Sequence, residues 1–496
     1  MTTHAPPLEQ AYPEKIDGAV LRIAGVVVLG ALMSILDITV VSVALPTFQD
    51  VFGATYATVA WTMTAYTLAL ATVIPLTGWA ADRFGTKRLY LAALFLFTAG
   101  SVLCAMATSI EMLIAFRVLQ GLGGGMLMPL GMTILTRAAG PDRIGRLMAV
   151  LGIPMLLGPI TGPILGGWLI DVASWHWIFL VNLPIGLLAL VYSWRVLPQD
   201  EPSETEPFDF LGMLLLSPGL ALFLFGVSSI AEGGEGASFG PRVWISGTIG
   251  VLLILAFVGH ALRAEKPLID LRLFRNRRLT IATVAMFVFV IAFMGAGLLF
   301  PSYFLQVRGE TTLMAGLLIA PQGLGAMVTM PIAGVLADRV LIGRTVPVAL
   351  LVMAAGFFVF TQVDADTSYL VLCGALFVMG LGMGGTMMPI MTSALKSLSN
   401  AEVARGSTLV NIVQQIGGSI GTAVLSVVLT NQIRSRMEGT TDPLQSLAEA
   451  FGSTYLVAFV LVLLALVPVA FLPRKKEEPN LLDDEDGAVA APVLMH

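Results

Sequence analysis

The chain has 496 residues, of which 56% are hydrophobic and only 12% are charged. Soluble globular domains carry about 25% charged residues, so this composition excludes an ordinary soluble domain and indicates a membrane protein. The formal net charge of -5 shows no basic excess that would favour binding to nucleic acid.

The chain opens with a polar segment, residues 1–19, that lacks the apolar core of a signal peptide, so we expect a retained tail. A transmembrane helix needs about 20 mostly apolar residues. Fourteen segments meet this requirement. They cover residues 20–45, 57–80, 89–108, 111–135, 147–171, 176–197, 209–231, 242–262, 280–305, 312–336, 344–362, 367–394, 406–430 and 452–472.

The loops between these spans carry their Lys and Arg residues unevenly. An even number of spans puts both termini on one side, which has 22 Lys and Arg residues, whereas the other side has 4. Positive residues concentrate in cytoplasmic loops. We therefore expect a multi-pass protein of the plasma membrane, in the bacterial case the inner membrane, with both termini in the cytoplasm.

Two short motifs occur twice in the chain. Residues 75–83 read PLTGWAADR and residues 331–339 read PIAGVLADR, 256 residues further on. Residues 124–130 (GGMLMPL) return at 384–390 (GGTMMPI), 260 residues further on. Nearly equal offsets indicate a duplicated six-helix unit with two helices inserted between the copies. Parallel halves of this kind are one plan for alternating-access carriers.

These features predict an all-α membrane protein of two six-helix bundles plus two inserted helices. The segments outside the spans are short and polar, so no further folded domain is expected. The predicted parts are a cytoplasmic tail (1–19), an N-terminal bundle (20–197), an acidic linker (198–208), an inserted helix pair (209–262), a basic cytoplasmic loop (263–279), a C-terminal bundle (280–472) and a disordered cytoplasmic tail (473–496).

Asp37 lies deep in the first span, and Arg117 is the only other charge clearly inside a span. A charge at the bilayer centre costs about 2.5–3.5 kcal/mol on insertion scales, so such residues are functional by default. At 1.5 Å per residue, Asp37 lies about 24 Å from the cytoplasmic side and Arg117 about 10 Å from the other, within a core about 30 Å thick. The two therefore lie at similar depth.

We expect Asp37 and Arg117 to face one cavity, to interact directly or through water, and to act in proton coupling. A carboxylate whose proton affinity changes with its surroundings can couple proton movement to a conformational change. The alternative is a permanent structural ion pair. On the coupling hypothesis, Asp37→Asn folds almost normally and loses proton-coupled movement.

The loop GWAADRFGTKR, residues 78–88, joins the second and third spans, and part of it returns in the second half. Positive-inside anchoring would need only the basic residues, so the repeated Gly and Asp favour a mechanical role in gating. The predicted gating residues are Gly78, Asp82, Arg83, Gly85, Arg88, Gly334, Asp338 and Arg339.

The fifth span has glycines every four residues, which form a surface for close helix packing, and prolines that favour a bend. Packing alone, or a part in the conformational change, would account for them. The residues are Gly158, Pro159, Gly162, Pro163, Gly166 and Gly167. Three polar residues inside spans, Gln120, Asn182 and Gln414, are candidates for a substrate cavity, or else for hydrogen bonds between helices.

Several other classes of protein lack their signals here. The four histidines are scattered, so we expect no metal site, and the G-x-G near Gly121 lies inside a span, which excludes a dinucleotide site. There is no P-loop motif and no nucleophile with a base at usable spacing, so we expect neither an enzyme nor a cofactor. Cys104 and Cys373 lie in apolar segments and are interpreted as buried apolar residues.

Taken together, the motifs resemble the major facilitator superfamily, and in particular its fourteen-helix drug:proton antiporter branch. The similarity covers nearly the whole chain. The motifs that carry it are DITVVSVALP (37–46), GWAADRFGTKR (78–88), LIAFRVLQGLGGG (113–125), the glycine-rich segment 158–167 and WHWIFLVNLPIG (175–186). Thr86 and His176 depart from it, because the branch usually has basic residues at both positions.

The resemblance implies efflux of amphipathic or lipophilic small molecules, driven by a proton gradient and without a cofactor. It implies proton coupling by Asp37 and Arg117, and gating by Gly78, Asp82 and Arg83. The alternatives are a dedicated exporter of one metabolite or lipid and, from another class, a non-transporting membrane sensor or scaffold. The partners expected are the lipid bilayer, protons and a small-molecule substrate; a periplasmic adaptor stays open.

Overall fold

The structure is a computed structural model that describes residues 18–139, 143–199, 207–231, 240–339, 342–399, 402–437 and 442–472. The predicted terminal tails and most of the acidic linker lie outside these ranges. Over the described ranges the chain is helical and contains no strand. The all-α prediction is therefore confirmed.

Each predicted span corresponds to a helix or to a pair of consecutive helices. The helices are α1 (Gly18–Phe52), α2 (Tyr56–Phe84), α3 (Thr86–Ala105), α4 (Ile110–Ala139), α5 (Ile144–Val172), α6 (Trp177–Leu180), α7 (Asn182–Val196), α8 (Phe210–Ala231), α9 (Pro241–Ala261), the short 3-10 helix η1 (Leu271–Arg275), α10 (Arg277–Gln306), α11 (Thr312–Arg339), α12 (Ile342–Phe360), α13 (Tyr369–Gly384), α14 (Met387–Lys396), α15 (Val403–Met437) and α16 (Pro443–Val469).

Length and composition fit a membrane protein. Thirteen helical segments among the described residues are long and apolar enough to cross a membrane. In addition, α5 is a helix of 29 residues in the same bundle. We call the side where α1 begins and α16 ends the termini side, and the side where α1 ends and α16 begins the far side.

Two spans are interrupted, at places the sequence explains. Proline has no N–H and cannot bond the carbonyl four residues earlier. Pro184 therefore cannot donate the usual backbone hydrogen bond to the carbonyl of Leu180, where α6 ends. In the same way, Pro389 cannot donate to the carbonyl of Gly385, between α13 and α14. The last span begins earlier than predicted, at Pro443, because the Asp442 side chain caps the helix by accepting from the Gln445 N–H at 3.1 Å.

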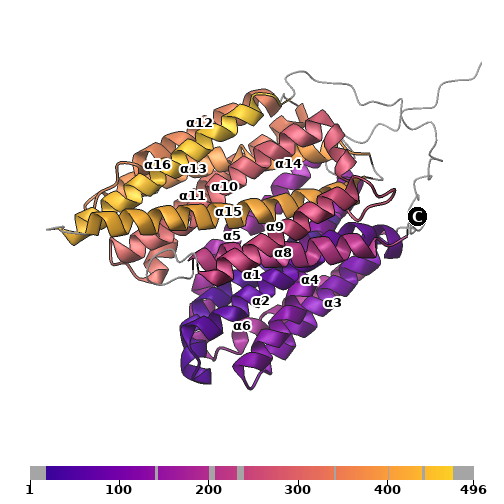
Figure 1. Cartoon of the computed structure of the whole chain (residues 1–496), viewed down its shortest axis with the longest axis horizontal. Coiled ribbons are helices and arrows are strands. Elements are labelled where there is room, and N and C mark those ends of the chain that lie inside the picture. The colour runs from indigo at the N-terminus through magenta and orange to yellow at the C-terminus, as the bar shows by residue number, and fades with distance from the viewer. Residues whose placement is uncertain are drawn as a thin grey trace, which may run out of the picture.

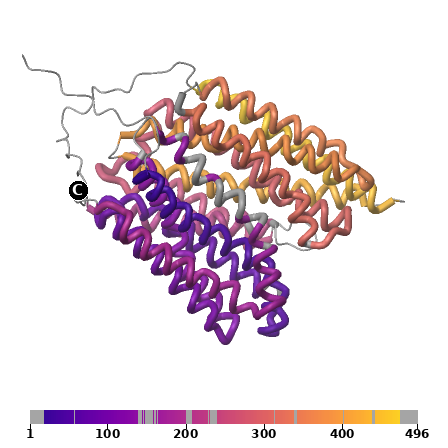
Figure 2. The backbone as a smooth tube through the Cα atoms, turned by 180° about the vertical axis from the view of Figure 1, so that it is seen from behind, coloured from indigo at the N-terminus to yellow at the C-terminus, as the bar shows by residue number. Residues whose placement is uncertain are grey.

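The two halves repeat one packing pattern. In the N-terminal half, α1 packs on α5 and α7, while α4 packs on α2 and α3. In the C-terminal half, α10 packs on α15 and α16, while α13 packs on α11 and α12. Contacts between the halves are also matched, since α5 meets α11 and α2 meets α15. Figures 1 and 2 show the indigo-to-magenta and the orange-to-yellow helices as two bundles side by side.

The inserted pair bridges the two halves. The helix α8 contacts α2 and α15, and α9 packs on α8, so the pair lies across the junction (Figure 1). Asp209 fixes its termini-side end by accepting from the N–H groups of Gly212 and Leu268 and from Nε2 of His260, at 2.8–2.9 Å. Burial acts to raise the pKa of Asp209, but these hydrogen bonds outweigh it and hold that pKa below its ordinary value.

Candidate functional site

The only charge pair predicted inside the spans forms a direct contact. Nη1 of Arg117, on α4, lies 2.5 Å from Oδ2 of Asp37, on α1. Both side chains are fully buried, each with 0% of its surface exposed. An ion pair removed from water in this way needs further hydrogen bonds to offset the loss of hydration.

The carboxylate of Asp37 receives those hydrogen bonds from two helices, α4 and α7. Besides Arg117, Gln120 on α4 donates to Oδ1 at 2.7 Å, and Asn182 on α7 donates at 3.3 Å. Both amides also donate to the hydroxyl of Ser101 on α3, at 2.6 Å and 3.1 Å. Since every partner of the carboxylate is a donor, this arrangement suits the ionised form of Asp37.

The guanidinium of Arg117 is held on its other sides. Its Nε donates to the backbone carbonyl of Thr62 at 3.0 Å, and Nη1 donates to Oε1 of Gln120 at 2.7 Å. Its central carbon lies 4.1 Å from the centroid of the Tyr66 ring, a distance at which cation–π attraction is favourable. Nη2 is buried without a hydrogen-bond partner among the described residues.

These contacts correct two expectations about an open cavity. Among the described residues, Asp37 and Arg117 are enclosed by helices of the N-terminal half and have no exposed side-chain surface, so they do not face an open cavity in this structure. Gln120 and Asn182, expected to line a substrate cavity, are buried and belong to the same cluster. Gln414, on α15 of the other half, is not part of it, and its Nε2 has no hydrogen-bond partner within the described ranges.

The glycines of α5 bring that helix against the segment of α1 that carries Asp37. A Cβ atom at Gly158 would lie 2.1 Å from Ile35, and one at Gly162 would lie 1.9 Å from the hydroxyl of Thr39. That hydroxyl donates to the carbonyl of Gly158 at 3.2 Å. Side chains on this face of α5 would therefore push α1 away.

The rest of the fifth-span motif is less uniform. Gly166 also approaches α1, since a Cβ there would lie 3.1 Å from Val40, whereas one at Gly167 would meet nothing within 4 Å. The side chains of Pro159 and Pro163 fall outside the described residues. The close-packing prediction therefore applies to three of the four glycines.

The first copy of the loop motif lies where the halves meet on the termini side. A Cβ at Gly78 would lie 3.2–3.3 Å from Thr408, Ala404 and Arg405 of α15. Asp82 lies 3.5 Å from Nη2 of Arg137 on α4 and 3.8 Å from Nε of Arg405. The carboxylate of Asp82 thus contacts cations from both halves.

Hydrogen bonds between α4 and α15 continue this contact. The hydroxyls of Thr133 and Ser407 are 2.9 Å apart, and Nδ2 of Asn411 lies 3.3 Å from the sulfur of Met132. All four residues are buried. Where α5 meets α11, the contact between the halves is apolar, because a Cβ at Gly152 of α5 would strike the side chain of Met330 of α11.

The remaining predicted gating residues differ in their surroundings. Gly85 has a φ of +83° between α2 and α3, a conformation that side chains rarely adopt. Arg83 and Arg88 are exposed. Thr86, which replaces a basic residue of the family motif, accepts from Arg137 at 2.9 Å.

In the second copy of the motif, Gly334 is buried in α11. The side chains of Asp338 and Arg339 lie outside the described residues. The described contacts between charged motif residues and the other half are therefore those of the first copy, at Asp82.

Sequence reasoning missed several members of these clusters. Ser101 and Tyr66 contact the charge pair, and Arg405 and Ser407 contact the first half from α15. A polar residue inside an apolar span was the available signal for Ser101. For Arg405 and Ser407 the sequence offers none, because their partners lie in the other half.

Comparison with known proteins agrees with this architecture. Residues 27–422 match the Major Facilitator Superfamily. The chain is 49% identical to the "Multidrug resistance protein B homolog" of Mycobacterium tuberculosis over 94% of this chain and 93% of that protein. It is 32% identical to the "Multidrug export protein EmrB" of Haemophilus influenzae over 85% of this chain and 82% of that protein.

A solved structure shows the same fold. The human organic anion transporter MFSD10 superposes with a TM-score of 0.61 at 18% identity, over 89% of this chain and 99% of that one. The family and these relatives indicate a multi-pass membrane transporter and not an enzyme. The match over residues 27–422 and the relatives at 49% and 32% identity show that this chain, with its two repeated halves, belongs to the Major Facilitator Superfamily.

Proposed function

We propose that the protein exports amphipathic or lipophilic small molecules across the plasma membrane in exchange for protons, by alternating access. In this proposal the termini side is cytoplasmic, which the Lys and Arg count of the loops supports. The names of two relatives, a multidrug resistance protein homolog and a multidrug export protein, support the substrate class.

The observation that carries the proposal is the buried pair of Asp37 and Arg117. A charge in the membrane interior is expensive, and an apolar pair of similar size would often be at least as stable. If Asp37 binds and releases protons during transport, this role accounts for the presence of the buried pair despite its energetic cost. Protonation of Asp37 would remove the charge that attracts Arg117 and the two amides, so these donors would rearrange together.

The contacts of α1 provide a route from that event to the rest of the molecule. Asp37 lies on the same segment of α1 as Ile35 and Thr39, which touch the glycine face of α5. The helix α5 in turn meets α11 of the other half. A rearrangement around Asp37 can therefore change how the halves pack.

The halves touch near the termini side, through the contacts of Gly78, Thr133 and Met330 described above. A closed termini side belongs to a state in which the substrate path opens to the far side. In the proposed cycle, protons reach Asp37 from the far side once the helices that enclose it in this structure move apart. The contacts of Asp82 with Arg137 and Arg405 then break when the termini side opens.

The test uses the purified full-length protein in liposomes with an imposed pH gradient and ethidium as the lipophilic cation. Wild type, Asp37→Asn and the matched control Asp50→Asn, an exposed position of the same helix, are compared. We expect gradient-driven ethidium movement by wild type and by Asp50→Asn only. Equal ethidium movement by Asp37→Asn would remove Asp37 from the mechanism. If wild type does not move ethidium but moves one neutral or anionic compound in the same assay, a dedicated exporter is favoured.

A further inference from the structure

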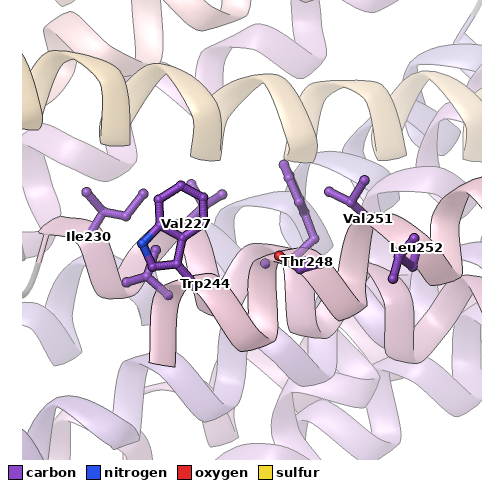
Figure 3. A pocket seen from close by; sticks show the side chains of 10 residues that line it. Val227, Ile230, Trp244, Thr248, Val251 and Leu252 are labelled. Carbon is purple, nitrogen blue, oxygen red and sulfur yellow. The ribbon is translucent and has the colours of Figure 1, made fainter. Parts of the chain in front are cut away.

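A groove lies between the two inserted helices, near their far-side ends. Its α8 wall consists of Phe223, Gly226, Val227 and Ile230, and its α9 wall of Val243, Trp244, Gly247, Thr248, Val251 and Leu252. We call this the α8–α9 groove. Figure 3 shows Ile230, Val227 and Trp244 at one end and Val251 and Leu252 at the other.

Glycines bring α8 and α9 into close contact beside the groove. A Cβ at Gly226 would lie 2.7 Å from the backbone nitrogen of Gly247, so the helices touch there without side chains. A Cβ at Gly247 would meet nothing within 4 Å, so this position opens into free space. The resulting volume is about 340 Å³, within the range of about 300–1,000 Å³ typical of ligand pockets.

The lining of the groove selects an apolar occupant. The hydroxyl of Thr248 is the only side-chain polar group besides the ring nitrogen of Trp244 among the lining residues. The groove is continuous with an apolar surface on α9, where Trp244 is 62% exposed and Leu252 is 59% exposed. In a helix that crosses the bilayer, such a surface faces lipid chains.

Charge at one end of the groove matches a phospholipid. Arg242 is exposed in the first turn of α9, next to Val243 of the groove. Arg and Trp residues at the end of a membrane span lie at the level of the lipid headgroups, and a guanidinium binds phosphate with paired hydrogen bonds. An occupant whose chain lies in the groove would therefore place its phosphate near Arg242.

We propose that the α8–α9 groove binds an acyl chain of a phospholipid from the far-side leaflet, and that Arg242 contacts its anionic headgroup. The bound lipid would become a third element of the inserted pair, packed on the helix that bridges both halves. This proposal is independent of the proton coupling proposed above, because no residue of the Asp37 cluster takes part.

The test is photolabelling of the full chain in phosphatidylcholine vesicles that contain a trace of phosphatidylglycerol with a diazirine in its acyl chain. Mass spectrometry then locates the label. We expect residues 243–252 to be labelled more than about fivefold over α12, whose Leu351 and Val348 are similarly exposed, because Arg242 alone would account for about fivefold and the groove adds to it. Equal labelling of the two segments would overturn the proposal.

Two substitutions on the same helix give the matched comparison. Gly247→Leu adds a side chain at a position that lines the groove and where a Cβ would meet nothing within 4 Å, and Gly259→Leu adds the same side chain outside the groove, where a Cβ also meets nothing within 4 Å. We expect labelling of 243–252 to fall to the level of α12 in Gly247→Leu and in a second filling variant, Thr248→Phe. Labelling that persists in both variants would contradict a bound chain.

A fourth substitution tests the headgroup. Arg242→Gln should lower labelling by the phosphatidylglycerol probe about fivefold, the effect of one basic residue at a membrane surface. Labelling by a diazirine phosphatidylcholine should stay unchanged. Equal loss with both probes, or no loss with either, would refute the role of Arg242.

Discussion

Neutralising Asp37 separates what the buried ion pair does for stability from what it does for transport. In Asp37→Asn the amide oxygen can still accept from Gln120 and Asn182, but Arg117 keeps its charge with no anion beside it. Removing one partner of a buried pair costs about 3–5 kcal/mol, because an uncompensated charge stays buried. The contacts of Asp37 thus predict a larger loss of stability for Asp37→Asn than the almost normal folding expected from the sequence.

The opposite substitution should cost less. Arg117→Gln leaves the carboxylate of Asp37 with two neutral donors, and a carboxyl group can escape its charge by taking up a proton. The double variant Asp37→Asn/Arg117→Gln has no buried charge and should recover part of the loss, with a coupling energy of about 0.5–3 kcal/mol between the two sites.

The measurement is unfolding of each variant in detergent, followed by transport in liposomes with a pH gradient. Asp50→Asn serves as the exposed control on the same helix. We expect the double variant to be more stable than Asp37→Asn and to lack gradient-driven movement. A double variant that transports like wild type would show that the pair is only structural, and an Asp37→Asn as stable as wild type would refute the energetic reasoning.

Three further predictions follow from close contacts on other helices. Gly162→Ala should destabilise the protein by about 1–3 kcal/mol in unfolding assays, because its Cβ would overlap Thr39, whereas Gly167→Ala should be neutral. Gly78→Leu should push the halves apart on the termini side. The distance between two spin labels, one on each half at that side, should then increase, and an unchanged distance would contradict this. Asp209→Asn should cost about 1 kcal/mol at neutral pH, because the amide has one acceptor oxygen where the carboxylate has two, so hydrogen bonding to Gly212, His260 and Leu268 cannot be complete. Because the pKa of Asp209 is lowered in the folded state, this difference in stability should be full above about pH 4 and should vanish as the pH falls through the lowered pKa.

Much of the fold follows from the sequence, because long apolar segments in a membrane can form little except helices. The repeated motifs also give the matched halves, as the equivalent packing of α2 on α4 and of α11 on α13 shows. The breaks near Pro184 and Pro389 coincide with missing N–H groups, but Pro46 and Pro75 lie inside continuous helices, so proline alone does not predict where a span is interrupted. The early start of α16 was not predictable, since its first turns are polar and a search for apolar residues passes over them.

The candidate site was predictable where contacts are local. Depth along straight helices placed Asp37 beside Arg117, and Gln120 lies one helical turn from Arg117 on the same face. The contribution of Asn182 depends on how α7 packs against α1, which no spacing in the sequence reveals. The enclosure of the pair was missed for the same reason, because burial depends on neighbours from several helices.

The most direct test of the proposed exchange reverses its direction. Liposomes containing the protein and a pH-sensitive dye are given an ethidium gradient without a pH gradient, and the internal pH is recorded. The account predicts that ethidium movement drives protons the opposite way in wild type and Asp50→Asn, and drives none in Asp37→Asn. Ethidium movement by wild type with no change in internal pH would contradict proton exchange.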